Sequence, residues 1–315
     1  MIIKPILIIG APRSGTSLLQ KILRNHPHLW SLPSESDMIW DMYCHPKLHH
    51  WESEYLTETD ITPEIRSEIL KQFERYLCPA YFWKPLEKNN MIWGFRRWRW
   101  LRKLMRPVYQ YTFPISQLLW RNKTKRIVEK TASNCFRLGF VNEVFPDAKI
   151  IYPTRDGHNN INSLINAWLH PNRFFTYDIP VNIKGYEHGK WKFVLPPGWS
   201  DYTNRSLEEV CAFQWQSCHQ FMLNEIAKPK YTNRVLQIKL EELVSEPKYW
   251  LKKIAEFVEL PYDDYFQSMA AELPVVNSPD NDTSAEKWKQ QHREKIERIM
   301  PIIRPTMQTL GYDYE

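Results

Sequence analysis

Near the start of the chain, a short apolar run leads directly into a glycine-containing loop. Residues 5–10 (PILIIG) are followed by the loop APRSGTS and by a helical pattern over residues 16–25. A strand, a tight loop and a helix in this order direct backbone N–H groups at an anion, and the helix N-terminus adds a partial positive charge. The chain has only nine glycines in 315 residues, and two of them, Gly10 and Gly15, lie here. This segment predicts a phosphate-binding loop, for which an ordinary strand-to-helix turn is the alternative.

The loop is close to the pattern GxxxxGK[ST] of nucleoside triphosphatases, but Thr16 stands where that pattern has lysine. Because the lysine contacts the β- and γ-phosphates, its absence argues against an ATPase or kinase of this type. Arg13 supplies the positive charge instead, and no apolar strand ends in an aspartate suited to bind magnesium. We therefore expect a phosphate-containing ligand that has no γ-phosphate and needs no metal.

Three further apolar runs predict strands of the same sheet, at residues 126–130 (RIVEK), 148–153 (AKIIYP) and 234–239 (RVLQIK). Their near-continuous hydrophobicity is typical of parallel strands covered on both faces. Strand–helix alternation predicts a mostly parallel α/β sheet. Residues 177–206, which contain three prolines, are expected to form a long excursion from this core. Helical patterns lie at residues 63–77, 134–145, 159–169, 207–227, 247–258 and 285–300.

The composition is that of a globular protein, with 43% hydrophobic and 25% charged residues, so the chain is not intrinsically disordered. We expect a single domain over residues 1–315. The five cysteines have no CxxC spacing, which favours reduced thiols and a cytoplasmic location. No stretch approaches the ~20 apolar residues that would span a bilayer, and the apolar start is expected to be a buried strand rather than a signal peptide.

The net charge of +6 conceals an uneven distribution. Residues 91–130 hold 11 lysines and arginines and one acid, whereas residues 35–75 hold ten acids and four bases. The basic segment suggests an anionic partner for one face of the protein. Within it, residues 95–106 (FRRWRWLRKLMR) could bind nucleic acid, a membrane surface or a sulfated glycan. We favour an amphipathic helix that packs on the core and has a basic outer face.

A second anion motif follows the strand predicted at residues 148–153. That strand leads into Thr154-Arg155-Asp156-Gly157-His158, and the next helix carries Ser163. Arg155 at the strand end and Ser163 about two turns into the helix can converge on one anion. Together with the first loop, this motif predicts two phosphate sites at the same edge of one sheet.

These motifs resemble those of the sulfotransferases that use 3′-phosphoadenosine 5′-phosphosulfate (PAPS). Residues 12–17 (PRSGTS) resemble the family's 5′-phosphosulfate loop, residues 155–163 (RDGHNNINS) its 3′-phosphate site, and residues 129–134 (EKTASN) its lysine-bearing strand end. Residues 236–247 (LQIKLEELVSEP) are similar to its late strand, and residues 286–315 to the ending of many bacterial members. PRSGT with RDG looks most like the branch that contains tyrosylprotein and carbohydrate sulfotransferases.

The resemblance implies a P-loop-like three-layer fold with a central, mostly parallel sheet flanked by helices. It implies transfer of a sulfuryl group from PAPS to a hydroxyl or amine of a small molecule, such as a natural product, or of a carbohydrate. Adenosine 3′,5′-bisphosphate is then the product, no metal is needed, and no nucleic-acid partner is expected. Sulfuryl transfer needs positioning and charge stabilisation more than covalent catalysis. Variable segments near residues 38–125 and 168–215, with their tryptophans and tyrosines, are expected to hold the acceptor.

The donor site follows residue by residue from the same resemblance. Arg13 is expected to bind the 5′-phosphate and stabilise the leaving oxygen, and Lys130 to lie beside the transferred sulfuryl group, with a solvated lysine as the alternative. A C-terminal lid is expected near residues 284–289, with helix packing as the alternative for its tryptophan. Lys239 lies near the position of an aromatic donor contact in relatives. The expected donor contacts are Arg13, Ser14, Gly15, Thr16, Ser17, Arg155, Ser163, Ser284, Lys287 and Trp288.

Glu35 is the expected general base. The cytosolic branch of the family has a histidine two residues after its lysine, but Ala132 stands there in this chain. In the tyrosylprotein branch a glutamate after the first helix takes the role, and Glu35 follows the first helix here. A carboxylate works best as a base near neutral pH when its pKa is raised, which partial burial can supply. Alternatively Glu35 flanks a helix start, and Asp37 and His158 are secondary candidates.

Two other functions stay open on the residues alone. A nucleotide kinase or ATPase with an altered loop would hydrolyse or transfer phosphate from ATP with magnesium. A non-enzymatic polyanion-binding protein would use residues 95–106, and its binding would weaken steeply with salt.

Overall fold

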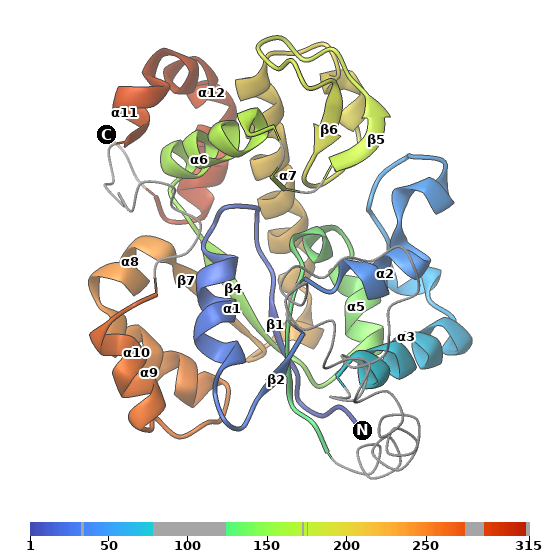
Figure 1. Ribbon diagram of the computed structural model, residues 1–315, viewed down its shortest axis with the longest axis vertical. Helices are drawn as coiled ribbons and strands as arrows, with labels where there is room; N and C mark the ends of the chain where they lie inside the picture. The colour runs from blue at the N-terminus through green and yellow to red at the C-terminus, as the bar shows by residue number, and fades with distance from the viewer. Residues whose placement is uncertain (33–34, 78–123, 172, 175, 275–286, 313–315) are drawn as a thin grey trace, which may run out of the picture.

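The computed structural model describes residues 1–32, 35–77, 124–171, 173–174, 176–274 and 287–312. Its centre is a five-stranded parallel sheet with the order β2-β3-β1-β4-β7 (Figure 1). All four predicted strands are present, and the fifth, β2, is only two residues long. The strands are β1 (Ile6–Ile8), β2 (Trp30–Ser31), β3 (Ile127–Lys130), β4 (Lys149–Thr154) and β7 (Val235–Lys239).

Two hydrophobic cores, one on each face of the sheet, give the protein three layers. Along β1, Ile6 and Ile8 point into one core and Leu7 points into the other, as the alternation of side chains along a strand requires. All three are at most 1% exposed, which explains why the run reads as continuously apolar. The three-layer α/β fold predicted from the sequence is confirmed.

Among the described residues, four helices cover the core that contains Ile6 and Ile8, and six cover the opposite core. Figure 1 shows the two groups on either side of the sheet. The first group is α1 (Thr16–Arg24), α8 (Leu240–Ser245), α9 (Pro247–Phe257) and α10 (Asp264–Ala271). The second group is α2 (Asp37–Cys44), α3 (Pro63–Tyr76), α5 (Leu138–Val144), α6 (Gly157–Leu169), α7 (Leu207–Ile226) and α12 (Arg293–Thr309).

Two predicted helices differ from the observed ones. The helix expected at residues 134–145 begins as a 3-10 turn, Ala132–Phe136, and becomes α5 only after Arg137. The helix expected at residues 285–300 is α11 (Lys287–Gln291), a break at His292, and then α12. Helix α12 continues to Thr309 although it contains two prolines, which normally end a helix and so made the prediction too short.

The predicted excursion after α6 contains a two-stranded antiparallel hairpin, β5 (Thr176–Pro180) and β6 (Lys190–Lys192). Its tryptophan Trp191 packs edge-on against Trp168 of α6, and both are completely buried. Trp215 of α7 and Trp40 of α2 are buried as well. These four tryptophans therefore serve the core rather than an open acceptor pocket.

Several sequence predictions fall outside the described residues, namely the basic segment 95–106, Cys78, Ser284 and most of the variable segment 38–125. The other four cysteines are buried and unpaired by disulfides. Within the described ranges, no helix combines the length and the hydrophobicity that crossing a membrane requires. The cytoplasmic location and the single domain remain predictions.

Candidate active site

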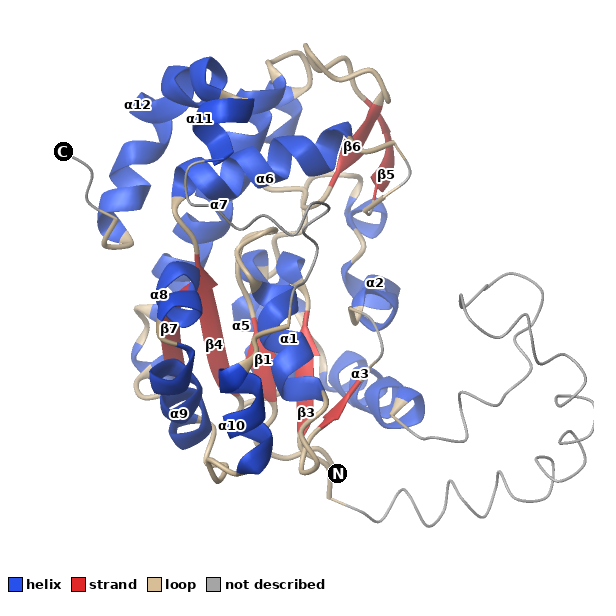
Figure 2. Ribbon diagram, turned by 60° about the vertical axis from the view of Figure 1, so that its left-hand side comes forward, coloured by secondary structure: helices blue, strands red, loops and turns tan. Residues whose placement is uncertain are grey.

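The predicted motifs meet at the carboxyl edge of the sheet. Strand β1 lies between β3 and β4, and the register pairs Ile8 with Lys130 on one side and with Ile151 on the other. The chain leaves β1 towards β2 and β3 on one side and later builds β4 and β7 on the other. Such a switch point opens a ligand crevice beyond the strand ends in α/β sheets. Figure 2 shows β4 pointing towards α6, which carries the second motif.

The loop after β1 is shaped for close approach of a ligand. Gly15 has a φ of 96°, and a Cβ at Gly10 would lie 2.7 Å from the carbonyl oxygen of Pro153, so neither position readily accepts a side chain. Helix α1 starts at Thr16 with no side-chain cap and no acidic residue in its first turn. Ser14 is completely buried, and its Oγ has no hydrogen-bond partner in the described part of the chain. An uncapped helix start and a buried hydroxyl without a partner suit an anion.

Arg13 joins the two predicted phosphate motifs. Its Nε donates a hydrogen bond to Ser163 Oγ at 3.0 Å, and Arg155 Nη1 donates to the backbone oxygen of Arg13 at 3.2 Å. Burial, together with the charges of Arg155 and Arg173, lowers the pKa of Arg13 from 12.5 to about 10. Like charges held this close favour the binding of an anion among them.

Arg173 and Phe174 are site residues that sequence reasoning missed. The Phe174 ring centre lies 5.1 Å from the Arg13 guanidinium carbon and 5.3 Å from that of Arg173, so the ring contacts both groups. Phe174 has a φ of 74°, which is strained for a bulky side chain. Both residues lie between α6 and β5, where no motif distinguishes them from ordinary loop residues.

Glu35 and Lys130, predicted from separate motifs, are in contact. Lys130 Nζ donates to Glu35 Oε1, and the Lys130 side chain is 5% exposed while that of Glu35 is 42% exposed. Lys130 ends β3, and Glu35 comes two residues before the start of α2. A buried cation and an accessible carboxylate therefore lie side by side at the sheet edge.

The two secondary candidates have different surroundings. Burial and the charges of Glu35 and Asp41 raise the pKa of Asp37. His158 is paired with Asp156, from His158 Nδ1 to Asp156 Oδ2 at 3.1 Å, and stacks on Trp288 with ring centres 4.7 Å apart. His158 therefore connects α6 to α11.

The predicted C-terminal contacts lie against α6. Gln291 of α11 accepts hydrogen bonds from Asn162 at 2.9 Å and Asn166 at 2.8 Å. Lys287 and Trp288 thus belong to a helix packed on the element that carries Ser163. Lys239 instead donates to the backbone oxygen of Gly311 at 2.5 Å, so its ammonium group contacts the C-terminal segment.

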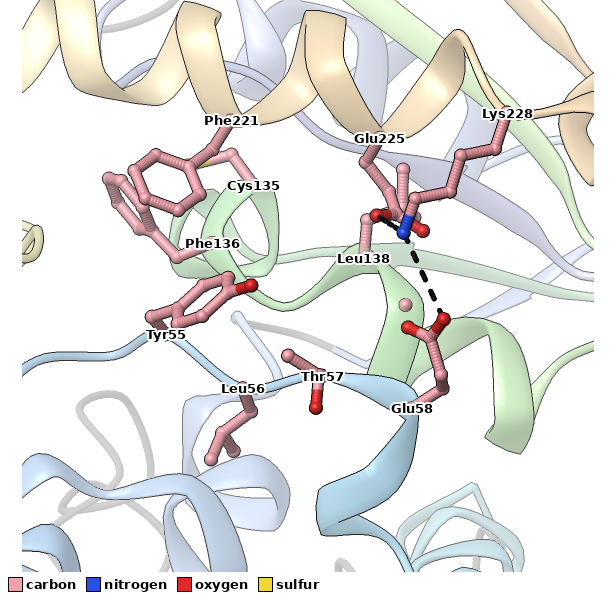
Figure 3. Close-up of a pocket in the computed structure, with 11 residues that line it drawn as sticks. Tyr55, Leu56, Thr57, Glu58, Cys135, Phe136, Leu138, Phe221, Glu225 and Lys228 are labelled. Carbon is pink, nitrogen blue, oxygen red and sulfur yellow. Dashed lines mark ion pairs between the residues drawn. The ribbon is translucent and has the colours of Figure 1, made fainter.

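A small pocket away from these residues has another lining (Figure 3). It lies between the segment around Glu58, the start of α5 and the end of α7. Lys228 is ion-paired there with Glu225 at 2.5 Å and with Glu58 at 3.9 Å. None of the predicted site residues lines this pocket, so it is not the candidate active site.

Comparisons with known proteins show the family to which this chain belongs. The sequence model of the family described as "Sulfotransferase family" matches residues 5–264. The protein-tyrosine sulfotransferase of Drosophila melanogaster is 23% identical over 332 residues, covering 98% of this chain and 51% of the fly protein. The protein-tyrosine sulfotransferase A of Caenorhabditis elegans is 22% identical, covering 98% of this chain and 67% of the relative. This chain therefore spans about half the length of the fly relative.

A solved structure shares the fold. The sulfotransferase domain from the curacin biosynthetic pathway superimposes with a TM-score of 0.53, at 18% sequence identity, and 99% of each chain is covered. At this identity the likeness concerns the arrangement of the sheet and helices rather than the ligands.

Proposed function

This chain belongs to the sulfotransferase family, and we propose that it moves a sulfuryl group from PAPS to a hydroxyl or amine of a small molecule or carbohydrate. The observation that carries the proposal is the meeting of four separate segments at one sheet edge. Different parts of the sequence supply Arg13, the Arg155–Ser163 motif, Lys130 and Glu35. Arg13 is hydrogen-bonded to Ser163, and Lys130 is hydrogen-bonded to Glu35.

The residues present fit the donor. The unpartnered Ser14 Oγ, the open start of α1 and the Arg13 side chain suit the 5′-phosphosulfate. Arg155 and Ser163 suit the 3′-phosphate. When bound, PAPS supplies an activated sulfuryl group on a good leaving group. The family resemblance also assigns Thr16, Ser17, Lys287 and Trp288 to the donor.

The chemistry assigned to this chain's own residues is proton removal and charge stabilisation. Glu35 accepts the proton of the acceptor hydroxyl or amine while the oxygen or nitrogen of the acceptor forms a bond to sulfur. The bond between sulfur and the 5′-phosphate oxygen breaks, and Lys130 and Arg13 stabilise the negative charge that develops on that oxygen. The contact between Lys130 and Glu35 supports these two roles, because it holds a carboxylate and a cation next to each other at the sheet edge.

The acceptor belongs to the proposal as well. The fly and nematode relatives are named protein-tyrosine sulfotransferases. The acceptor panel should therefore include a tyrosine hydroxyl, so that its turnover can be compared with that of small-molecule and carbohydrate acceptors.

Glu35→Gln tests the proposal. Turnover of PAPS with a panel of hydroxyl and amine acceptors should fall by roughly 10²–10⁴, the usual contribution of a general base. The Kd of adenosine 3′,5′-bisphosphate, measured by calorimetry, should stay within about twofold. The matched control is Glu52→Gln, at an exposed position after α2, and both turnover and the Kd of this variant should match wild type.

Equal losses of turnover and of bisphosphate affinity in Glu35→Gln would assign Glu35 a structural role. No stabilisation of the wild-type protein by adenosine 3′,5′-bisphosphate, together with magnesium-dependent ATP hydrolysis, would replace the sulfotransferase proposal with the nucleotide kinase or ATPase alternative.

A further inference from the structure

A row of carboxylates continues from the proposed base along α2. Asp37 and Asp41 are four residues apart in this helix and so share one of its faces. Burial raises the pKa of both carboxyl groups, and neighbouring carboxylates add to the effect, from Glu35 at Asp37 and from Glu54 at both. The row therefore runs from Glu35 through α2 to Glu54.

Glu54 differs from the two aspartates because both its oxygens are already used. Tyr177 Oη donates to Glu54 Oε1, and the backbone N–H of Leu195 donates to Glu54 Oε2 at 2.7 Å. Asp37 and Asp41, in contrast, have no hydrogen-bond or ion-pair partner among the described residues. They are therefore the members of the row that can bind something else.

Arg137 lies close enough to the row for its charge to interact with Asp37, Asp41 and Glu54. Its Nε donates to Asn134 Oδ1 at 2.9 Å. Its guanidinium carbon lies 5.9 Å from the ring of Trp40, which comes between the two aspartates in the sequence of α2. Burial acts to lower the pKa of Arg137, but the negative groups around it, Asp37 and Asp41 among them, raise it.

The Arg137 guanidinium is only partly satisfied. The residue is 1% exposed, yet neither Nη1 nor Nη2 has a hydrogen-bond partner in the described part of the chain. A buried guanidinium with unused donors is costly, unless an oxygen atom from outside the protein accepts from it.

The charges indicate what such a ligand is. Among the described residues the row has four carboxyl groups (Glu35, Asp37, Asp41 and Glu54), and Lys130, Arg137 and His45 are basic groups that interact with it. Because the pKa values of Asp37 and Asp41 are raised, their ionised forms are short of positive charge, so an added cation is favoured and an added anion is opposed. The unused donors of Arg137 add a need for a hydrogen-bond-accepting oxygen.

We propose that Asp37, Asp41 and Arg137 form an acceptor subsite that binds a compound with an ammonium group beside its hydroxyl groups. The inference rests on the proposed function, because Glu35, two residues before Asp37, is the proposed base. The ammonium group donates to the two aspartates, and a hydroxyl oxygen accepts from Arg137. Amino alcohols and amino sugars have this chemistry, whereas an acidic peptide has the opposite charge.

Three methyl glycosides of different charge test the subsite: methyl β-D-glucosaminide (an ammonium group at C2), methyl β-D-glucoside (neutral) and methyl β-D-glucuronide (a carboxylate at C6). Their Kd values are measured by NMR titration in the presence of adenosine 3′,5′-bisphosphate. We expect the glucosaminide to bind about tenfold more tightly than the glucoside, and the glucuronide to bind most weakly.

Asp41→Asn should remove most of the advantage of the glucosaminide and change the Kd of the glucoside by less than about twofold. Asp37→Asn should act in the same way and replaces Asp41→Asn if that variant does not fold. Asp264→Asn is the control, because Asp264 is exposed at the start of α10, outside the segments expected to hold the acceptor. It should leave the order of the three probes unchanged.

The inference is overturned if the glucuronide binds as tightly as the glucosaminide, if no probe binds, or if Asp41→Asn weakens all three equally. Failure of adenosine 3′,5′-bisphosphate to bind would overturn the proposed function instead. In that case the Kd values of the three probes, measured without the bisphosphate, would still test the subsite. Bisphosphate binding with a flat probe series would overturn the subsite alone.

Discussion

At the scale of single residues, the donor side of the site is defined by guanidinium groups that lie close together. Arg13 experiences the charges of Arg155 and Arg173, which together with burial lower its pKa to about 10. Such an arrangement destabilises the protein on its own and is relieved when an anion binds. Sequence motifs identified Arg13 and Arg155, while Arg173 is recognised only from its contact with Phe174.

Arg173→Ala should weaken the binding of adenosine 3′,5′-bisphosphate by about three- to tenfold, because one cation near the anion site is lost. The effect should shrink in high salt, which screens the charge of this exposed arginine. Calorimetric titration at two salt concentrations measures both. Arg66→Ala, at an exposed position of α3, is the control and should match wild type. Unchanged affinity in Arg173→Ala at low salt would remove Arg173 from the donor site.

His219 predicts a pH dependence of stability. Burial lowers the pKa of His219 from 6.5 to about 3, and Tyr152 Oη lies 2.5 Å from its Nδ1. At a pH between these two pKa values, the histidine is protonated in the unfolded chain and neutral in the folded protein. Stability is therefore lost as the pH falls below about 6.5, with a slope approaching ~1.4 kcal/mol per pH unit from this group.

In His219→Gln this contribution should disappear, since glutamine does not titrate. Urea unfolding of wild type and variant between pH 4 and pH 7 gives the difference in slope, and groups common to both cancel. His188→Gln, at an exposed histidine, should keep the wild-type slope. Parallel curves for wild type and His219→Gln would show that His219 is protonated in the folded protein.

At the scale of elements, the site depends on how closely the loop after β1 approaches the end of β4. Gly10→Ala would place a Cβ 2.7 Å from the Pro153 carbonyl oxygen, a backbone atom that cannot move independently. We expect the free energy of unfolding to fall by about 1–3 kcal/mol, as in other overpacked cores. Adenosine 3′,5′-bisphosphate should also bind more weakly, because the loop shifts.

The matched control for that prediction is Gly157→Ala at the start of α6. Its Cβ would lie 2.9 Å from Met307 Sδ, which is at the end of a flexible side chain and can move aside. Chemical denaturation should therefore show a smaller loss than in Gly10→Ala. Equal losses in the two variants would mean that the contact with β4 is not what restricts the loop.

The elements that could be predicted from the sequence are those with a strong local pattern. Buried strands such as β1 and β4 are continuously apolar. Helix α6 starts at Gly157 after the capping residue Asp156, whose side chain accepts from the backbone N–H of Asn159. Strand β2 could not be predicted, because two partly exposed residues have no periodicity. The break between α11 and α12 at His292 has no glycine or proline to announce it.

At the scale of the whole molecule, the site is made of segments far apart in the chain. Glu35 contacts Lys130, 95 positions later, and Asn162 on α6 contacts Gln291, 129 positions later. The motifs indicated the chemistry of Arg13 and Lys130, since each lies in a recognisable pattern. That Nη1 and Nη2 of Arg137 have no partner among the described residues could not be predicted, because it depends on how distant segments pack in three dimensions.

The loop after β1 and helix α11, which are far apart in the sequence, both contact α6. Arg13 from the first loop is bonded to Ser163, and His158 of the same helix stacks on Trp288 of α11. Adenosine 3′,5′-bisphosphate bound between the loop and α6 should therefore slow amide hydrogen exchange in residues 10–24 and in α11 together, because ligand binding opposes local opening. Exchange measured with and without the bisphosphate tests this coupling.

Trp288→Ala is the informative variant for the same measurement. If Trp288 transmits the effect or contacts the donor, α11 should lose its protection while residues 10–24 keep theirs. Tyr249→Ala, at an exposed position of α9, should leave both responses as in wild type. Protection confined to residues 10–24 in the wild-type protein would show that α11 is packed on α6 without taking part in donor binding, the alternative that the sequence left open for Trp288.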